Sequence, residues 1–102
     1  MTRFEWDSAK EQTNRRKHGV SFEIARQVFS DPDALVEQDR IESGEVRWQT
    51  IGAVNGILLL LVAHTVDFDD DERDEMIRII SARRANRRER KRYEKERQKN
   101  YS

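Results

Sequence analysis

Asn55-Gly56 lies between two runs with the composition of β-strands, Val46–Val54 and Ile57–Val66. Both residues tolerate the positive φ angles of a two-residue turn, so this pair is the strongest short signal for a β-hairpin. The second run is almost continuously apolar, which is typical of a strand buried on both faces. The chain is therefore expected to be built around one antiparallel hairpin whose second strand is central in its sheet.

Two helices are expected before the hairpin. Ser8 and Glu11 fit a capping box, in which each residue caps the backbone of the other, and this predicts a helix over about 9–18. Ser21 fits the N-cap of a second helix. Asp31-Pro32 ends that helix, because the residue before a proline avoids the helical region.

Two further strands and a last helix complete the expected order. Ala34–Asp39 and Met76–Ala82 have β-like patterns on either side of the hairpin. Asn86 and Glu89 fit another capping box, so a helix should begin near Arg87. The predicted fold is α+β, with two N-terminal helices, a four-stranded mainly antiparallel sheet and a C-terminal helix.

Charged residues make up 39% of the chain and hydrophobic residues 35%, which suits one small core between about two layers of secondary structure. One domain is expected over residues 1–98, with a frayed tail at 99–102. The sequence has no cysteine, which excludes disulfides and a thiolate nucleophile. No signal peptide is expected, and the longest apolar run, Ile57–Ala63, is far too short to span a membrane. The expected location is the cytoplasm, with no membrane partner.

The formal net charge of zero conceals an uneven distribution of charge. Residues 83–102 carry a net charge of +7, and residues 1–82 carry −7. Such a split suggests a basic surface with an anionic partner. The alternative is a solvated basic helix stabilised by Glu–Arg pairs along its own surface.

Metal binding is not expected. Asp67, Asp69 and Asp71 occupy the first, third and fifth positions of a calcium-loop pattern in the acidic segment 67–75. The sixth position is Glu72 where a glycine is needed, and the twelfth is Arg78 where a bidentate glutamate is needed. The two histidines are not at zinc-ligand spacing, and no nucleotide-binding glycine motif is present, so no cofactor is predicted.

An arginine cluster is the strongest candidate for function. Arg78 lies inside a predicted strand, and Arg83 and Arg84 lie at its end, where alternation should send them to opposite faces. Arg47 is next to Trp48 in another strand. Guanidinium groups beside an aromatic ring suit a phosphodiester and an unstacked base. The alternative is that Arg78, Arg83 and Arg84 pair with carboxylates of the sheet.

The chain resembles the BrnT family of bacterial type II toxins. The resemblance runs in order from Phe4 to Glu94, and its most specific combination is KHGVSF, RIISARRA and ERKRY. The other matching segments are FEWDSAKEQTNRR, VFSDP, EVRWQTIG and NGILLLLVAHT. One departure is Asp67, where many members carry a basic residue.

Membership implies a RelE-like fold and a metal-independent endoribonuclease that inhibits translation. It also implies neutralisation by a BrnA-type antitoxin with a ribbon-helix-helix DNA-binding domain, and a homodimer within the toxin–antitoxin complex is a further candidate arrangement. The candidate catalytic residues are Arg47, Arg83, Glu89, Arg90, His18 and Tyr93. The candidate RNA-binding residues are Lys17, Arg78, Arg84 and Arg87.

Cleavage without a metal can use the 2′-OH of RNA as nucleophile, and it then needs a base, an acid and cations that stabilise the phosphorane. Arg47 and Arg83 suit the cationic role, because guanidinium is always charged and binds phosphate in a bidentate way. Glu89, His18 and Tyr93 are all candidates for proton transfer. Glu89 can alternatively serve only as a capping-box partner, and His18 can serve only to cap its helix.

Two other classes of function remain open at this stage. One is an RNA-binding module without catalysis, and the other is a module that binds only a protein partner. In the ribonuclease reading, Arg83 and Arg90 are expected to face the RNA-binding sheet surface. The outer cations of the last helix should form a solvated basic face; they are Arg87, Arg88, Lys91 and Lys95.

Overall fold

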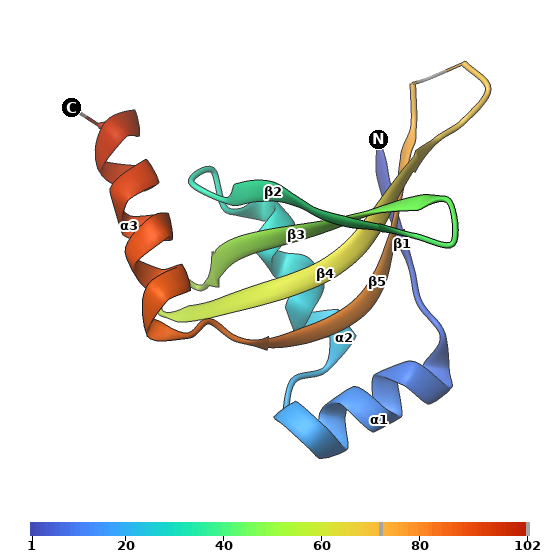
Figure 1. Cartoon of the computed structure of the whole chain (residues 1–102), viewed down its shortest axis with the longest axis horizontal. Helices are drawn as coiled ribbons and strands as arrows, with labels where there is room; N and C mark the ends of the chain where they lie inside the picture. The colour runs from blue at the N-terminus through green and yellow to red at the C-terminus, as the bar shows by residue number, and fades with distance from the viewer. Residues whose placement is uncertain (72, 102) are drawn as a thin grey trace.

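Five strands form one mixed sheet in the order β1-β5-β4-β3-β2 (Figure 1). The computed structural model describes residues 1–71 and 73–101, so Glu72 of the acidic segment and the last residue of the predicted tail lie outside the described residues. The strands are β1 (Thr2–Glu5), β2 (Leu35–Glu42), β3 (Glu45–Val54), β4 (Leu58–Phe68) and β5 (Glu75–Arg84).

The central hairpin predicted from Asn55-Gly56 is confirmed. Strands β3 and β4 pair antiparallel, with Val54 opposite Leu58 beside the turn. Asn55, with a φ of 55°, and Gly56, with a φ of 70°, are the two central residues of a β-turn closed by the bond from the Ile57 N–H to the Val54 carbonyl. The strand β4 has neighbours on both sides and is buried along most of its length.

The prediction of a four-stranded, mainly antiparallel sheet is wrong in one respect, because the chain begins with a fifth strand. Strand β1 pairs in parallel with β5, from Thr2 opposite Glu75 to Glu5 opposite Arg78. This strand has only four residues and a mostly exposed surface. Its anchor is Phe4, which packs against the main core. So short and polar a strand has no recognisable β pattern in the sequence.

The first helix, α1 (Ser8–His18), begins one residue earlier than expected and uses a different cap. The carboxylate of Asp7 accepts hydrogen bonds from the backbone of Ala9 and Lys10. Glu11 instead accepts a bond from the backbone N–H of Phe22, 3.2 Å away, and so ties α1 to the next element.

The second predicted helix is divided. One α-helical turn, α2 (Phe22–Ala25), continues as a 3-10 helix, η1 (Arg26–Ser30). The last helix, α3 (Arg87–Asn100), has the predicted capping box of Asn86 and Glu89. It continues to Asn100, into the segment expected to be a frayed tail. None of the helices in the described part of the chain is long and apolar enough to cross a membrane.

The two faces of the sheet are covered unequally. The helices α2 and η1 lie on one side, where Phe22, Val28 and Leu60 are fully buried in the larger core cluster, and α1 lies along the β5 edge. On the other face α3 packs only over one end of the sheet, where Tyr93 contacts the cluster of Ile51, Leu59 and Leu61 (Figure 1). We call the rest of this second face the open face.

Asn14 of α1 completes the edge of β5 beyond the point where β1 ends. Its side-chain amide donates to the carbonyl oxygens of Val20 and Ala82, both at 2.9 Å. Its side-chain oxygen accepts from the N–H of Ala82 at 3.1 Å. The buried amide therefore replaces a neighbouring strand and fixes the C-terminal end of α1 beside the sheet.

Gly52 is required by the close approach of η1 to β3. A Cβ atom at this position would lie 2.9 Å from both the Cβ and the carbonyl oxygen of Val28. Val28 is itself fully buried, so neither group can move without disturbing the core.

We therefore expect Gly52→Ala to lower the free energy of unfolding by about 1–3 kcal/mol, the usual cost of overpacking a core. Gly44→Ala is the control, because nothing lies within 4 Å of its Cβ position and only the strain of a φ of 78° remains. Urea unfolding of both variants checks the prediction. A Gly52→Ala variant as stable as the parent would contradict it.

Candidate functional site

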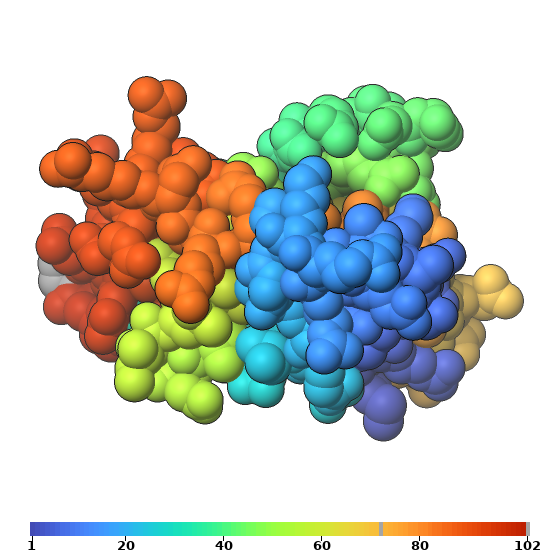
Figure 2. Space-filling model, turned by 90° about the horizontal axis from the view of Figure 1, so that it is seen from below, coloured from blue at the N-terminus to red at the C-terminus, as the bar shows by residue number. Residues whose placement is uncertain are grey.

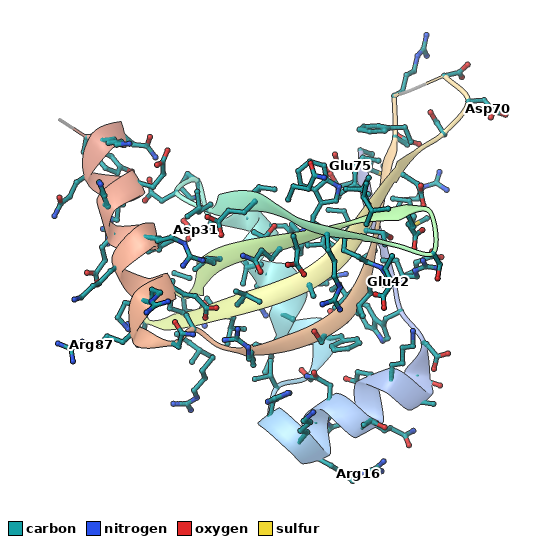
Figure 3. All side chains as sticks on the ribbon, viewed as in Figure 1. Arg16, Asp31, Glu42, Asp70, Glu75 and Arg87 are labelled. Atoms are coloured by element: carbon teal, nitrogen blue, oxygen red, sulfur yellow. The ribbon has the colours of Figure 1, made fainter. Side chains whose placement is uncertain are left out.

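The open face gathers polar side chains from β3, β4 and β5 on the side where α3 stands. Arg83 pairs with Leu61, and Arg78 pairs with Thr65, so all four side chains are on one face of the sheet. Figure 3 shows these polar side chains between α3 and the β2–β3 turn, where Glu42 is labelled. In the space-filling view, α3 and the β2–β3 hairpin stand on either side of a notch (Figure 2).

A β-bulge is the reason why Arg78 and Arg83 share this face. Residues five apart in a regular strand point to opposite sides. Between the Ala63–Ser81 pair and the His64–Ile79 pair, β5 contains one extra residue. The bulge reverses the alternation and returns Arg78 to the same side as Arg83.

Arg83 is held by Glu89 at the start of α3. Two parallel hydrogen bonds of 2.7 and 2.8 Å join its guanidinium to the carboxylate. Glu89 also accepts from the backbone N–H of Asn86, as the capping box requires. The bond from Arg83 lowers the pKa of Glu89, and the bond to Glu89 raises the pKa of Arg83. Glu89 is therefore an ionised anchor that orients Arg83.

A second arginine pair lies farther along the open face. Arg78 donates to both carboxylate oxygens of Glu45, at 2.9 and 3.1 Å. Arg47 lies 3.8 Å from the same carboxylate and 3.7 Å from Glu42. The alternative of arginines paired with sheet carboxylates is thus realised for Arg78, whereas the carboxylate that pairs with Arg83 belongs to α3. Glu45 brings Arg78 and Arg47 together.

The two arginine groups are separated along the sheet. Arg83 is level with Leu61 and Arg78 with Thr65, four residues and therefore about 13 Å farther along β4. Their carboxylate partners draw them in opposite directions, Arg83 toward α3 and Arg78 toward the β2–β3 hairpin. This spacing suits contacts to different groups of one extended ligand.

Arg92 and Glu37 join α3 to the sheet between these groups. The guanidinium of Arg92 donates to both oxygens of Glu37, at 3.1 and 3.3 Å. Gln49 donates to one of these oxygens at 2.9 Å. Sequence reasoning missed these three residues and Glu45. The signal available in the sequence was strand alternation, which puts Glu37, Glu45 and Gln49 on the face of the sheet that carries the arginines.

Tyr93 and Arg90 lie away from the arginines of the open face. The hydroxyl of Tyr93 donates to Asp31 at 2.6 Å. Burial and this bond raise the pKa of Tyr93 well above its usual value. Burial opposes the charge of Asp31, but bonds from Tyr93 and from the backbone of Ala53 and Asp33 outweigh it and lower the pKa of Asp31.

Arg90 and Tyr93 line a hollow of about 470 Å³ with Asn55, Gly56 and Asp33. Arg90 is two residues from Arg92, so the two side chains point about 200° apart around α3. The expectation that Arg90 shares the sheet surface with Arg83 is therefore wrong. It lies on the turn side of the helix.

Lys17 and His18 lie at the exposed C-terminal end of α1. Both line a hollow of about 350 Å³ that also contains Ile80 and Ser81 of β5. Ser81 pairs with Ala63 between the levels of Arg78 and Arg83. The end of α1 is therefore at the edge of the sheet beside the open face.

Arg84 and Arg87 are separated from the other candidates. Arg84 pairs with Leu60, so it points to the opposite face from Arg83, as alternation predicted. Arg87 is exposed at the start of α3 and extends away from the sheet (Figure 3). Among the described residues, no group of three or more potential metal ligands is clustered.

These features define an α+β protein with arginines on an open sheet face beside a C-terminal helix. A family model described as "Ribonuclease toxin, BrnT, of type II toxin-antitoxin system" matches residues 6–89. The chain belongs to this BrnT family of ribonuclease toxins. Membership implies an RNA target and an antitoxin partner.

The fold is similar to that of a solved member. The 1.1 Å crystal structure of the Brucella abortus ribonuclease toxin BrnT matches with a TM-score of 0.62 and 26% sequence identity. The match covers 85% of this chain and 99% of that one. No curated protein matches the chain.

His64 is the other histidine, and its position is structural. It is 1% exposed, and its ring packs edge-on against Phe29 with centroids 4.9 Å apart. Its Nε2 is 2.7 Å from the hydroxyl of Thr50, and its Nδ1 is 3.3 Å from the carbonyl of Thr65. A carbonyl only accepts, so Nδ1 carries the proton and Nε2 accepts from Thr50. Burial lowers the pKa of His64 from 6.5 to about 4.

This shift predicts a pH-dependent stability. The unfolded chain takes up a proton at His64 below pH 6.5, whereas the folded protein does so only near pH 4. The free energy of unfolding should therefore be fully retained above pH 6.5 and fall by up to about 3 kcal/mol as the pH drops to 4. Denaturant titrations across this range measure the slope.

His64→Gln should reduce the slope, and His18→Gln is the matched control at an exposed position. Equal slopes for the parent and the His64 variant would contradict the assignment. The comparison uses slopes and not absolute stabilities, because replacing a buried ring also changes packing.

Proposed function

We propose that this protein is a metal-independent endoribonuclease that cleaves single-stranded RNA on the open face and thereby inhibits translation in the cytoplasm. The observation that carries the proposal is the row of guanidinium groups on this face in a member of a ribonuclease toxin family. The mixed sheet with a C-terminal helix at one end also supports a RelE-like classification.

Arg83 and Arg47 have separate roles in this proposal. Because their ion pairs direct them toward opposite ends of the face, they bind successive parts of one RNA strand and not a single phosphate. Arg83 is the better candidate for the reacting phosphate, because Glu89 fixes its orientation and its side chain is 38% exposed. A fixed guanidinium can stabilise a phosphorane without reorganising.

The reaction assigned to the site is attack of a 2′-OH on the adjacent phosphorus. The O–P bond to the next nucleotide breaks, which leaves a 2′,3′-cyclic phosphate and a 5′-OH. A base must accept the 2′-OH proton, and an acid must supply one to the leaving oxygen. These steps require no metal.

His18 is the preferred residue for proton transfer among the three candidates. Glu89 is held ionised by Arg83 and Asn86 and serves as an anchor. The hydroxyl of Tyr93 donates a hydrogen bond to Asp31 and serves to fix α3 against the sheet. His18 lies at the exposed edge beside Ser81, within the hollow that adjoins the open face.

The antitoxin is proposed to be of the BrnA type, with a ribbon-helix-helix DNA-binding domain. The outward cations of α3 suit an acidic segment of such a partner, since Arg87, Arg88 and Lys91 are all exposed. Two toxin chains within the complex are part of the proposal.

Purified protein should cleave mixed RNA equally well with and without a chelator. Arg83→Ala should slow cleavage about a hundredfold or more, because it removes a cation that stabilises the transition state. Arg47→Ala and His18→Gln should also slow it, and growth arrest on expression should weaken in parallel. Gel analysis and end-labelling of the products measure the rates and the cyclic phosphate.

Arg26→Ala is the control, since Arg26 pairs with Glu23 on the helical side of the sheet. Chelator-sensitive cleavage would contradict the metal-independent reaction. RNA retention without cleavage would favour a binding module, and indifference to RNA would favour a module for a protein partner. Circular dichroism establishes that each variant is folded.

The basic face of α3 should add long-range attraction to RNA. Replacing Arg87, Arg88 and Lys91 with Gln should weaken RNA binding and make its salt dependence shallower, because fewer counterions are released. Fluorescence anisotropy over a range of salt concentrations measures the slope. An unchanged slope would mean that this face is only a solvated surface.

A further inference from the structure

Among the described residues, two buried side-chain atoms on the open face have no hydrogen-bond partner: Nε of Arg47, which lies 3.7 Å from a carboxylate oxygen of Glu42, and Oγ1 of Thr65. Thr65 is only 1% exposed. Native proteins satisfy nearly all buried polar groups, and each exception calls for a physical explanation, such as a catalytic role, a bound ion or an ordered water. No catalytic or structural role assigned above accounts for the Thr65 hydroxyl.

These two groups are neighbours in a row that crosses three strands. Trp48 of β3 pairs with His64 of β4. Because the two strands are antiparallel, Arg47 and Thr65 stand opposite each other at the next position along the ladder. On the other side Thr65 pairs directly with Arg78 of β5. The threonine hydroxyl therefore lies between two arginines.

Glu45 covers this row from the β2–β3 hairpin. Its carboxylate accepts two bonds from Arg78 and lies 3.8 Å from Arg47. Glu42, 3.7 Å from Arg47, adds a second negative charge at the hairpin end and is shared with Arg40. A carboxylate bridging two guanidinium groups occupies the position that a phosphodiester takes between arginines.

We propose that Arg47, Thr65 and Arg78 form a seat for one phosphodiester of single-stranded RNA, and that Glu45 occupies this seat in the free protein. This inference rests on the proposed ribonuclease function and adds a second phosphate contact about 13 Å from the level of Arg83. The phosphate replaces Glu45 at both arginines. It also supplies the acceptor that the Thr65 hydroxyl and the Arg47 Nε lack.

The seat has a regulatory consequence for the free protein. RNA must displace an ionised side chain that is already bound to Arg78, so Glu45 competes with substrate. Its negative charge also repels the approaching backbone. The Glu45 carboxylate therefore weakens the binding of RNA that makes few other contacts with the open face.

The probe for this seat is a single-stranded RNA oligonucleotide with every 2′-OH methylated, which removes the nucleophile. Glu45→Gln should bind this probe about three- to tenfold more tightly than the parent, because a competing charge is removed. Glu23→Gln is the matched control, since it makes the same charge change at an ion pair on α2. Fluorescence anisotropy at one salt concentration measures both.

Thr65→Val tests the hydroxyl directly, because valine has nearly the same shape. It should weaken probe binding about tenfold, the loss of one hydrogen bond to a charged group, and should leave the unfolding midpoint equal or higher. Thr65→Ser should restore the binding. A merely structural threonine would affect stability and leave RNA affinity unchanged.

The seat is overturned if Glu45→Gln binds no more tightly than Glu23→Gln, or if folded Thr65→Val binds like the parent. Cleavage of unmodified RNA is measured separately. If the parent cleaves RNA but the two variants bind the probe with the affinity of the parent, the seat is rejected and the ribonuclease function is retained. If the variants show the predicted changes in probe affinity but the parent does not cleave RNA, the ribonuclease chemistry is rejected and the seat is retained.

Discussion

Burial of β4 on both faces is the constraint on which the rest of the structure depends. One side of this strand packs under α2 and η1 through Leu60 and Val62, and the other packs under α3 through Leu59 and Leu61. A slip of one residue would exchange these two sets, so the register is strongly specified. The same register determines the level of each arginine, because β5 is aligned against β4. The spacing of the arginines on the candidate surface is thus set by a hydrophobic requirement.

Patterns confined to a few consecutive residues were readable from the sequence. The Asn55-Gly56 hairpin, the capping box of Asn86 and Glu89 and the opposite directions of Arg83 and Arg84 are all local in this sense. Strand β1 was missed because its stability comes from β5 and not from its own four residues. The shared face of Arg78 and Arg83 could not be derived from the sequence, because strict alternation puts residues five apart on opposite faces and only the bulge in β5 reverses that.

Acidic and basic residues that are separated along the chain lie side by side in the folded protein. The acidic first part of the chain supplies Glu37, which pairs with Arg92 of the basic last segment. It also supplies Glu45, which pairs with Arg78 inside the first part itself. Glu89 does the same within the last segment. The cations of the open face are therefore oriented by carboxylates on separate elements. The outward cations of α3 remain exposed and account for the basic character of that end.

The parallel contact between β1 and β5 has a consequence for the timing of folding. Thr2 and Glu75 are partners although they are 73 positions apart, and such distant pairings form slowly because a long loop must close first. During synthesis β1 emerges long before its partner exists, and α3, with its anchor for Arg83, emerges last. The nascent toxin therefore cannot assemble its arginine surface while most of its chain is still being made. The candidate site is thus assembled only after α3 has been synthesised.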